Sequence, residues 1–172
     1  MARLRAMTVR SQPLPEGALL GAHARDGHYT DCFAADVAAA VSHAQYVEAF
    51  YTTWVFKLER WILRWAVAKP STDAQARQLA AGTLRSFSAW AVEARADNQL
   101  IMRDQFTRRT CSWLMVAPLP GGRTRLYFGS GVSPQRGGGL GLNFGLLLGF
   151  HTLYSRILLG AARRRLEVLA HG

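Results

Sequence analysis

The chain has few of the residues on which metal and catalytic sites depend. Among its 172 residues are only two cysteines, Cys32 and Cys111, too few for a disulfide scaffold and without a nearby cysteine or histidine at metal-ligand spacing. No HExxH motif is present, and the glycine-rich run Gly137 to Gly141 lacks the Lys-Ser/Thr of a phosphate-binding loop. We therefore expect no metal, no cofactor, two buried thiols and a reducing, cytoplasmic location.

Acidic residues and lysine are also scarce. The chain has eleven Asp and Glu against twenty-one Lys and Arg, which gives a formal charge of +10, and only Lys57 and Lys69 are lysine. A basic protein can neutralise the phosphates of nucleic acid. However, the arginines are scattered apart from Arg108-Arg109 and Arg163 to Arg165, and no nucleic-acid-binding module is recognisable. The sequence therefore does not favour a nucleic-acid partner.

A long apolar run is missing from the first 25 residues. They contain basic residues and two prolines, and no segment has the length of a secretory h-region. This composition predicts a loosely ordered N-terminal arm over residues 1–25. The remaining residues, 26–172, have the size of one domain with a single core.

The first half of this domain has a helical period. A short aromatic segment, His28 to Phe33, predicts an opening strand. From Ser42, a potential cap, apolar residues such as Tyr46, Phe50 and Trp54 recur at spacings of three and four as far as Lys69. This pattern predicts one bent helix or two successive ones, with a break at Thr52-Thr53. Ser71 or Thr72 can cap a further short helix that ends at Gly82.

The second half changes to the alternating period of strands. Turn residues at Asp97-Asn98 and Pro118 to Gly122 separate the segments, and Gly129 and Gly131 suit a bulge or a close backbone approach. A long apolar helix is predicted over 140–169, after a glycine connection. The sequence thus predicts an α+β fold in which an antiparallel meander packs against a long C-terminal helix. The predicted strands are 83–95, 100–106, 110–117 and 123–132.

The C-terminal helix has two interpretations. Its residues 140–159 contain only His151 and Arg156 as ionisable groups besides the phenol of Tyr154, and three arginines follow, which is typical of a membrane segment with a basic flank. Polar residues such as Asn143 and Ser155 are costly in hydrocarbon, and a helix packed on a sheet also needs a wide apolar surface. We favour the packed helix and keep membrane insertion or attachment to a membrane surface as the alternative.

Aromatic and polar side chains of the sheet and this helix define a candidate ligand site. Because pockets between a curved sheet and a helix are mainly apolar, we expect a small apolar or amphipathic ligand there, with an arginine at its anionic end. The alternative is a cyclase-like or hydrolase-like enzyme that uses Asp104 or Glu93 with His151 for proton transfer. The predicted ligand-binding residues are Trp90, Asp104, Arg109, Trp113, Arg125, Tyr127 and His151.

Several strings resemble a family of uncharacterised bacterial proteins: AFYTTWVFKLERWIL, KPSTD, CSWLMV, TRLYFGSGV and GFHTLYSRILLGAA. This resemblance covers about Asp31 to Leu166 and implies no activity. More loosely, the layout is similar to START-like helix-grip proteins, which include lipid-transfer domains and polyketide cyclases. That resemblance implies a sheet that grips the C-terminal helix. The chain has about five predicted strands where the superfamily usually has more, so the size of any cavity stays open.

Overall fold

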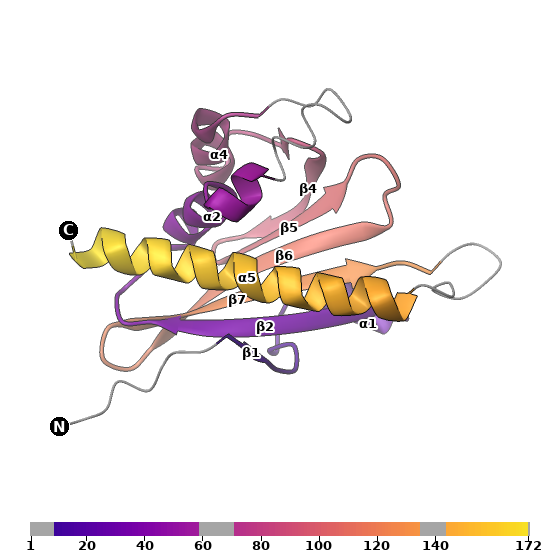
Figure 1. The fold of residues 1–172 in the computed structure, drawn as a ribbon, viewed down its shortest axis with the longest axis horizontal. Coiled ribbons are helices and arrows are strands. Elements are labelled where there is room, and N and C mark those ends of the chain that lie inside the picture. Colours follow the sequence, from indigo (N-terminus) through magenta and orange to yellow (C-terminus); the bar gives the residue numbers. More distant parts are fainter. Residues whose placement is uncertain (1–8, 59–70, 135–143, 172) are drawn as a thin grey trace.

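The computed structural model describes residues 9–58, 71–134 and 144–171, which form an α+β protein (Figure 1). Seven strands make one antiparallel sheet in the order β1-β2-β7-β6-β5-β4-β3. They are β1 (Arg10–Ser11), β2 (Tyr29–Val37), β3 (Ser86–Phe87), β4 (Trp90–Ala96), β5 (Gln99–Asp104), β6 (Thr110–Leu119) and β7 (Arg123–Val132). The helices are α1 (Gly21–Arg25), α2 (His43–Tyr51), α4 (Asp73–Ala80) and α5 (Phe144–His171), and residues 54–58 are also helical.

The predicted meander and C-terminal helix are confirmed. Strands β3 to β7 pair in chain order, and α5 crosses one face of the sheet beside α2 (Figure 1). The predicted strand 83–95 is instead two strands, because Ser88 between them adopts a left-handed conformation with φ of 54°. The strand β2 pairs with β7 over its full length, from Tyr29 opposite Val132 to Val37 opposite Thr124.

The helix boundaries follow local capping. Ser42 and Thr72 each accept a hydrogen bond from the backbone N–H three residues later, in capping boxes completed by Gln45 and Gln75. The predicted break at Thr52-Thr53 is confirmed: the Thr52 hydroxyl bonds back to the carbonyl oxygen of Glu48 at 2.6 Å, and the helix stops at Tyr51.

The sheet has an apolar core on each face. The helix face, which α2, α4 and α5 cover, buries Leu114 of β6 and Phe128 of β7 among many others. The arm face, which residues 14–20 cover, buries Trp113 of β6 and Tyr127 of β7. Side chains alternate between the faces along each strand, so neighbours in sequence belong to different cores.

The segment expected to be a loose arm includes β1 and α1 within its described residues. Strand β1 pairs with β2, and Ala18 and Leu20 are buried on the arm face. The apolar residues around Leu20 are too few to predict a helix or strand from period alone, and the sheet surface beneath them holds them in place.

The predicted close backbone approach is confirmed at Gly129, whereas the close neighbour of Gly131 is a side chain. A Cβ atom on Gly129 would lie 2.6 Å from the carbonyl oxygen of Asp31, and one on Gly131 would lie 2.7 Å from Sγ of Cys111. The pairing of β7 with both neighbours is continuous here, so no bulge accompanies the glycines. The thiols of Cys32 and Cys111 are free and buried, and burial raises the pKa of each to about 12.

Two predicted segments, the helical residues Trp61 to Lys69 and the connection Gly137 to Gly139, lie outside the described residues. No helix in the described part of the chain has the length and hydrophobicity to cross a membrane.

Candidate functional site

The structure distributes the predicted ligand-binding residues over both faces of the sheet. Trp113, Arg125 and Tyr127 lie on the arm face, whereas Trp90 packs against the helix-face core and His151 lies on α5. Asp104 and Arg109 bracket the loop between β5 and β6. The seven side chains therefore do not gather in one place, because Trp113 and Tyr127 lie on the face of the sheet opposite to α5.

The arm-face aromatic residues join the N-terminal segment to the sheet. Trp113 is fully buried, its ring centroid lies 6.1 Å from that of Tyr127, and its Nε1 donates to Oε1 of Gln99 at 2.8 Å. The same Gln99 oxygen accepts from the backbone N–H of Leu19, and its amide nitrogen donates to the carbonyl oxygen of Gly17. A ligand at this place would have to displace the segment that Gln99 holds.

Arg125 is occupied by a carboxylate of the protein itself. Its guanidinium donates to both oxygens of Asp36, at 2.6 and 2.9 Å, and Arg10 reaches the same carboxylate at 3.3 Å. The hydrogen bond from Arg125 lowers the pKa of Asp36, and the bond to Asp36 raises the pKa of Arg125. Such a bidentate pair leaves this arginine little capacity for an anionic ligand.

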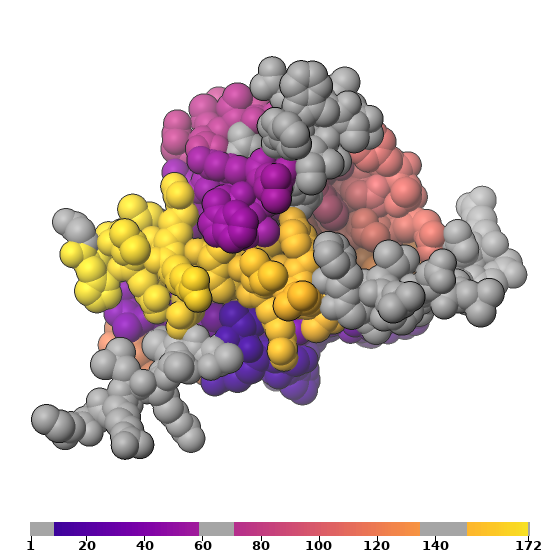
Figure 2. Space-filling model, viewed as in Figure 1, coloured from indigo at the N-terminus to yellow at the C-terminus, as the bar shows by residue number. Residues whose placement is uncertain are grey.

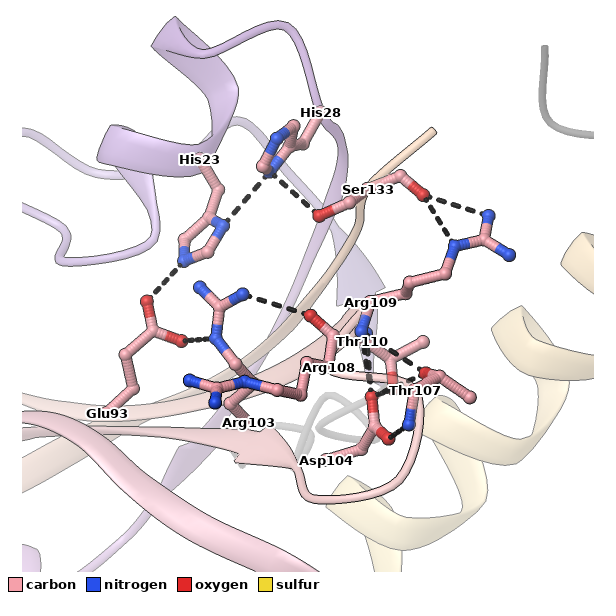
Figure 3. A network of polar contacts seen from close by, with 10 residues as sticks. All are labelled: His23, His28, Glu93, Arg103, Asp104, Thr107, Arg108, Arg109, Thr110 and Ser133. Atoms are coloured by element: carbon pink, nitrogen blue, oxygen red, sulfur yellow. Dashed lines mark hydrogen bonds and ion pairs between the residues drawn. The ribbon is translucent and has the colours of Figure 1, made fainter. Parts of the chain in front are cut away.

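Asp104 organises the loop between β5 and β6. Its carboxylate accepts hydrogen bonds from the backbone N–H groups of Phe106, Thr107, Arg109 and Thr110 and from both threonine hydroxyls, at 2.6 to 3.0 Å (Figure 3). Burial works to raise the pKa of Asp104, but the hydrogen bonds from Thr110 and Thr107 outweigh it and hold the pKa well below its usual range. A carboxylate with this many donors is a poor proton acceptor, so Asp104 fits a structural role.

Arg109 contributes to the same region through its side chain. Its guanidinium donates to the carbonyl oxygen of Ser133 through Nε at 3.3 Å and through Nη2 at 3.0 Å (Figure 3). It thereby connects the loop after β5 to the end of β7.

A chain of polar contacts joins α1 to the strands β4 and β5 on the arm face. Nε2 of His23 lies 2.8 Å from Glu93, whose other oxygen accepts from Nε of Arg103 at 2.7 Å (Figure 3). Burial works to raise the pKa of Glu93, but the bonds from Arg103 and His23 outweigh it and lower the pKa. Nδ1 of His23 lies 3.1 Å from Nδ1 of His28, which is also 3.3 Å from the Ser133 hydroxyl.

The histidine pair can hold one proton between its facing nitrogens. Because Nε2 of His23 meets a carboxylate, that nitrogen carries a hydrogen, and either His23 or His28 supplies the single hydrogen shared by the two Nδ1 atoms. Glu93 is thus engaged on both oxygens and lies on the arm face, apart from His151. Among the described residues, no group of three or more His, Cys, Asp or Glu side chains is placed to hold a metal ion.

His151 contacts a serine and an aspartate that β7 and β2 bring together. Its Nε2 lies 2.5 Å from Oγ of Ser130, and Ser130 donates through Oγ and its backbone N–H to Oδ1 of Asp31, at 2.7 and 2.8 Å. Oδ2 of Asp31 is buried, lacks a hydrogen-bond partner among the described residues, and lies 3.5 Å from Nε2 of His151. Sequence reasoning identified His151 but missed Asp31, whose position depends on the pairing of β2 with β7.

These three residues do not form the triad of a serine hydrolase. An ionised carboxylate only accepts, so the single hydroxyl hydrogen of Ser130 goes to Asp31, and His151 must donate to Ser130 from Nε2. A histidine that activates serine has to accept the hydroxyl hydrogen instead, with the carboxylate on its other nitrogen. Ser130 is also buried within β7, so the arrangement favours a tether between α5 and the sheet.

A groove of about 990 Å³ runs along the outward side of α5. It is bordered by Trp54 on one side and by Val9, just before β1, on the other. Figure 2 shows the yellow C-terminal part of α5 between the purple segment above it and the indigo N-terminal segment below it. Three apolar side chains beside it are strongly exposed: Trp54 is 70%, Val168 72% and Leu169 67% accessible. The groove is lined by Val9, Trp54, Arg156, Ile157, Gly160, Ala161, Arg163, Arg164, Arg165, Val168 and Leu169.

Four arginines surround these apolar side chains. Arg163 lies 3.7 Å from Glu167, whereas no acidic side chain of the described residues pairs with Arg156, Arg164 or Arg165. Large exposed apolar groups in a patch are unusual on a soluble surface and mark interaction sites. The sequence pointed to the arginine triplet and to the break at Thr52-Thr53. The apolar spacing continues through Trp54, however, and does not show that this side chain lies at the surface.

Comparison with known proteins does not assign the chain to a family. No protein-family model matches it, and no curated protein matches it. A crystal structure of a Rhodobacter sphaeroides protein from a structural genomics consortium is similar at 14% sequence identity and a TM-score of 0.45, with 95% of this chain and 97% of that chain covered.

Proposed function

We propose that this protein binds an anionic amphipathic molecule in the groove of α5. The observation that carries the proposal is the combination, on one surface, of exposed Trp54, Val168 and Leu169 with arginines that lack acidic partners among the described residues. The apolar part of the ligand would lie against the tryptophan and the aliphatic side chains. Its anionic group would meet the guanidinium groups.

The helix-grip layout is part of this proposal. The order of β2, α2 with the following helices, the meander β3 to β7 and α5 is the one that the START-like resemblance implies. Fold analogy supports ligand binding only by association. The side chains described between the sheet and α5, such as Phe128, Leu158 and Leu159, are buried against one another. We therefore place the ligand on the outward side of the helix.

Simple energetics favour an amphipathic ligand over a purely polar or purely apolar one. Burial of alkyl carbons contributes about 0.8 kcal/mol per methylene group. An arginine–phosphate or arginine–carboxylate contact adds a charge-assisted hydrogen bond, and the guanidinium can make it bidentate. Arg156, Arg164 and Arg165 are exposed at the groove. Arg156 lies over the ring of Phe33, and Arg165 donates to the carbonyl oxygen of Thr52 at 3.5 Å, so Arg164 is best placed to meet such a group.

Calorimetric titration tests the proposal. We expect decyl phosphate, below its critical micelle concentration, to bind more tightly than decanol, which lacks the charge, and than decyltrimethylammonium, which reverses it. Arg164→Ala should weaken binding of decyl phosphate. Arg77→Ala on α4, also an exposed helical arginine, is the matched control and should leave it unchanged. Equal binding of the three compounds, or equal effects of the two variants, would contradict the proposed site.

A further inference from the structure

We infer that the groove of α5 receives its ligand at the surface of an anionic membrane, with α5 lying along the interface. The inference rests on the proposed function, since it names the source of the amphipathic molecule. It starts from the outward side of α5, which in a packed helix would ordinarily be polar.

The outward side of α5 carries a stripe of exposed apolar side chains that includes one arginine. Leu153, Ile157 and Val168 follow one another at spacings of four and eleven, which place them on one side of the helix, and Arg164 lies on that side between Ile157 and Val168. Ser155, Leu158, Leu159, Ala162 and Leu166 are the residues that face the protein. The stripe spans about 22 Å at 1.5 Å per residue.

Trp54 extends the stripe sideways. It begins the helical residues 54–58 and lines the groove, and its indole is largely exposed. Tryptophan is favoured at membrane–water interfaces because its large ring is apolar and its N–H is polar. A ligand inside the groove would lie against Trp54 and Val168 but would leave exposed Leu153, which is not among the groove-lining residues, in water, whereas a lipid surface covers all three together.

The charge of this surface fits anionic lipid. Side chains 151–171 include four arginines and one acidic residue, Glu167, and all four arginines line the groove. Each basic residue near an anionic leaflet strengthens attachment by about fivefold. The repeated, laterally mobile phosphates of a bilayer can occupy several guanidinium groups at once, which one soluble anion cannot. An interfacial helix with arginines beside its apolar side matches this pattern.

Vesicle flotation of the purified full chain tests the inference. We expect binding to phosphatidylcholine vesicles that contain phosphatidylglycerol, little binding to phosphatidylcholine alone, and release by salt because the attraction is screened. The pair Val168→Asn with Leu169→Asn should weaken binding by about tenfold or more, since it removes two apolar contacts. Arg164→Ala should weaken it by about fivefold.

Control variants and a soluble ligand distinguish a failure of the membrane inference from a failure of the proposed ligand binding. Phe106→Asn removes an exposed aromatic group from the loop after β5, and Arg77→Ala an exposed arginine from α4; both should bind vesicles as the parent does. Unchanged thermal unfolding would show that the variants are folded. Vesicle binding that the groove variants do not alter overturns the inference. Binding of decyl phosphate without vesicle binding overturns it too, but leaves the proposed function standing, whereas binding of neither removes both.

Discussion

The hydroxyl oxygen of Ser130 on β7 lies 2.5 Å from Nε2 of His151 on α5, and the same hydroxyl donates to Asp31 on β2. This relationship fixes the helix to the two adjacent strands at one polar position. Nearby, the α5 interface relies on apolar contacts such as those of Leu158 and Leu159. It also determines what Ser130 can do, because its only hydrogen is committed to a carboxylate.

Ser130→Ala should therefore lower the free energy of unfolding, and Ser130 in the parent should not react as a nucleophile. The variant leaves Oδ1 of Asp31 with the backbone N–H of residue 130 as its donor and leaves Nε2 of His151 without the serine oxygen, which we expect to cost about 1–2 kcal/mol. Urea unfolding measures the loss. Ser86→Ala at an exposed position serves as the control and should be near neutral. A fluorophosphonate probe should not label Ser130; labelling would contradict the proton arrangement.

Gly129→Ala should be far more destabilising than an ordinary glycine substitution. The new Cβ would lie 2.6 Å from the carbonyl oxygen of Asp31, 2.9 Å from Leu20 and 3.0 Å from Trp113, so strand and arm would have to move apart. We expect a loss of about 3 kcal/mol or more. Gly160→Ala on α5 is the opposite case, because its nearest neighbour is 3.8 Å away.

The expected gain for Gly160→Ala is about 0.5–1 kcal/mol, from the higher helix propensity of alanine. Thermal unfolding of both variants gives the comparison. If the two substitutions had similar effects, the close approach of the arm to β7 would not constrain the fold.

The His43 side chain should make stability depend on pH. Its burial lowers the pKa to about 4, against an ordinary value of 6.5, so the unfolded chain binds a proton more readily. The stability that comes from burying His43 in its neutral form is complete above pH 6.5. It is lost as pH falls toward 4, by up to about 3 kcal/mol of unfolding free energy. His43→Leu removes the titration, and the difference between the two urea-unfolding profiles should change between pH 6.5 and 4. A constant difference would mean that His43 is protonated equally in both states.

The features that the sequence predicts correctly are those that neighbouring residues determine. Ser42 and Thr72 each cap a helix through a residue three positions on, and Asp97-Asn98 turns the chain between β4 and β5. The alternating period of the predicted strand 110–117 likewise requires Trp113 and Leu114 to lie on opposite faces, as observed. Each of these outcomes depends on contacts within a few residues.

The polar contacts of the sheet and the exposure of the groove residues depend on parts of the chain that are far apart in sequence, so no local pattern predicts them. Asp31 and Ser130 are 99 positions apart, and His23 and Glu93 are 70 apart. Both faces of the sheet are apolar, so the sequence could not tell that α5 covers Leu114 rather than Trp113. The exposure of Trp54 arises in the same way, because the direction of residues 54–58 follows from tertiary packing after the break at Thr53.

Asp104→Asn should destabilise the loop between β5 and β6 at neutral pH. The Asp104 carboxylate accepts six hydrogen bonds through its two oxygens. Asparagine replaces one of these oxygens by an NH2 group, which cannot accept, so we expect the free energy of unfolding to fall by about 2–3 kcal/mol. Asp97→Asn, at the exposed turn before β5, is the control and should change little.

Urea unfolding of the parent and Asp104→Asn at a series of acidic pH values distinguishes the contribution of Asp104 from that of His43. Because the hydrogen bonds hold the pKa of Asp104 below its ordinary value of 3.8, its contribution is complete above that pH and is lost only as pH falls below it. The difference in unfolding free energy between the parent and Asp104→Asn should therefore be constant from neutral pH down to about pH 4 and shrink in stronger acid. A difference that already shrinks near pH 6 would mean that the carboxylate is not held by the donors of Thr107 and Thr110.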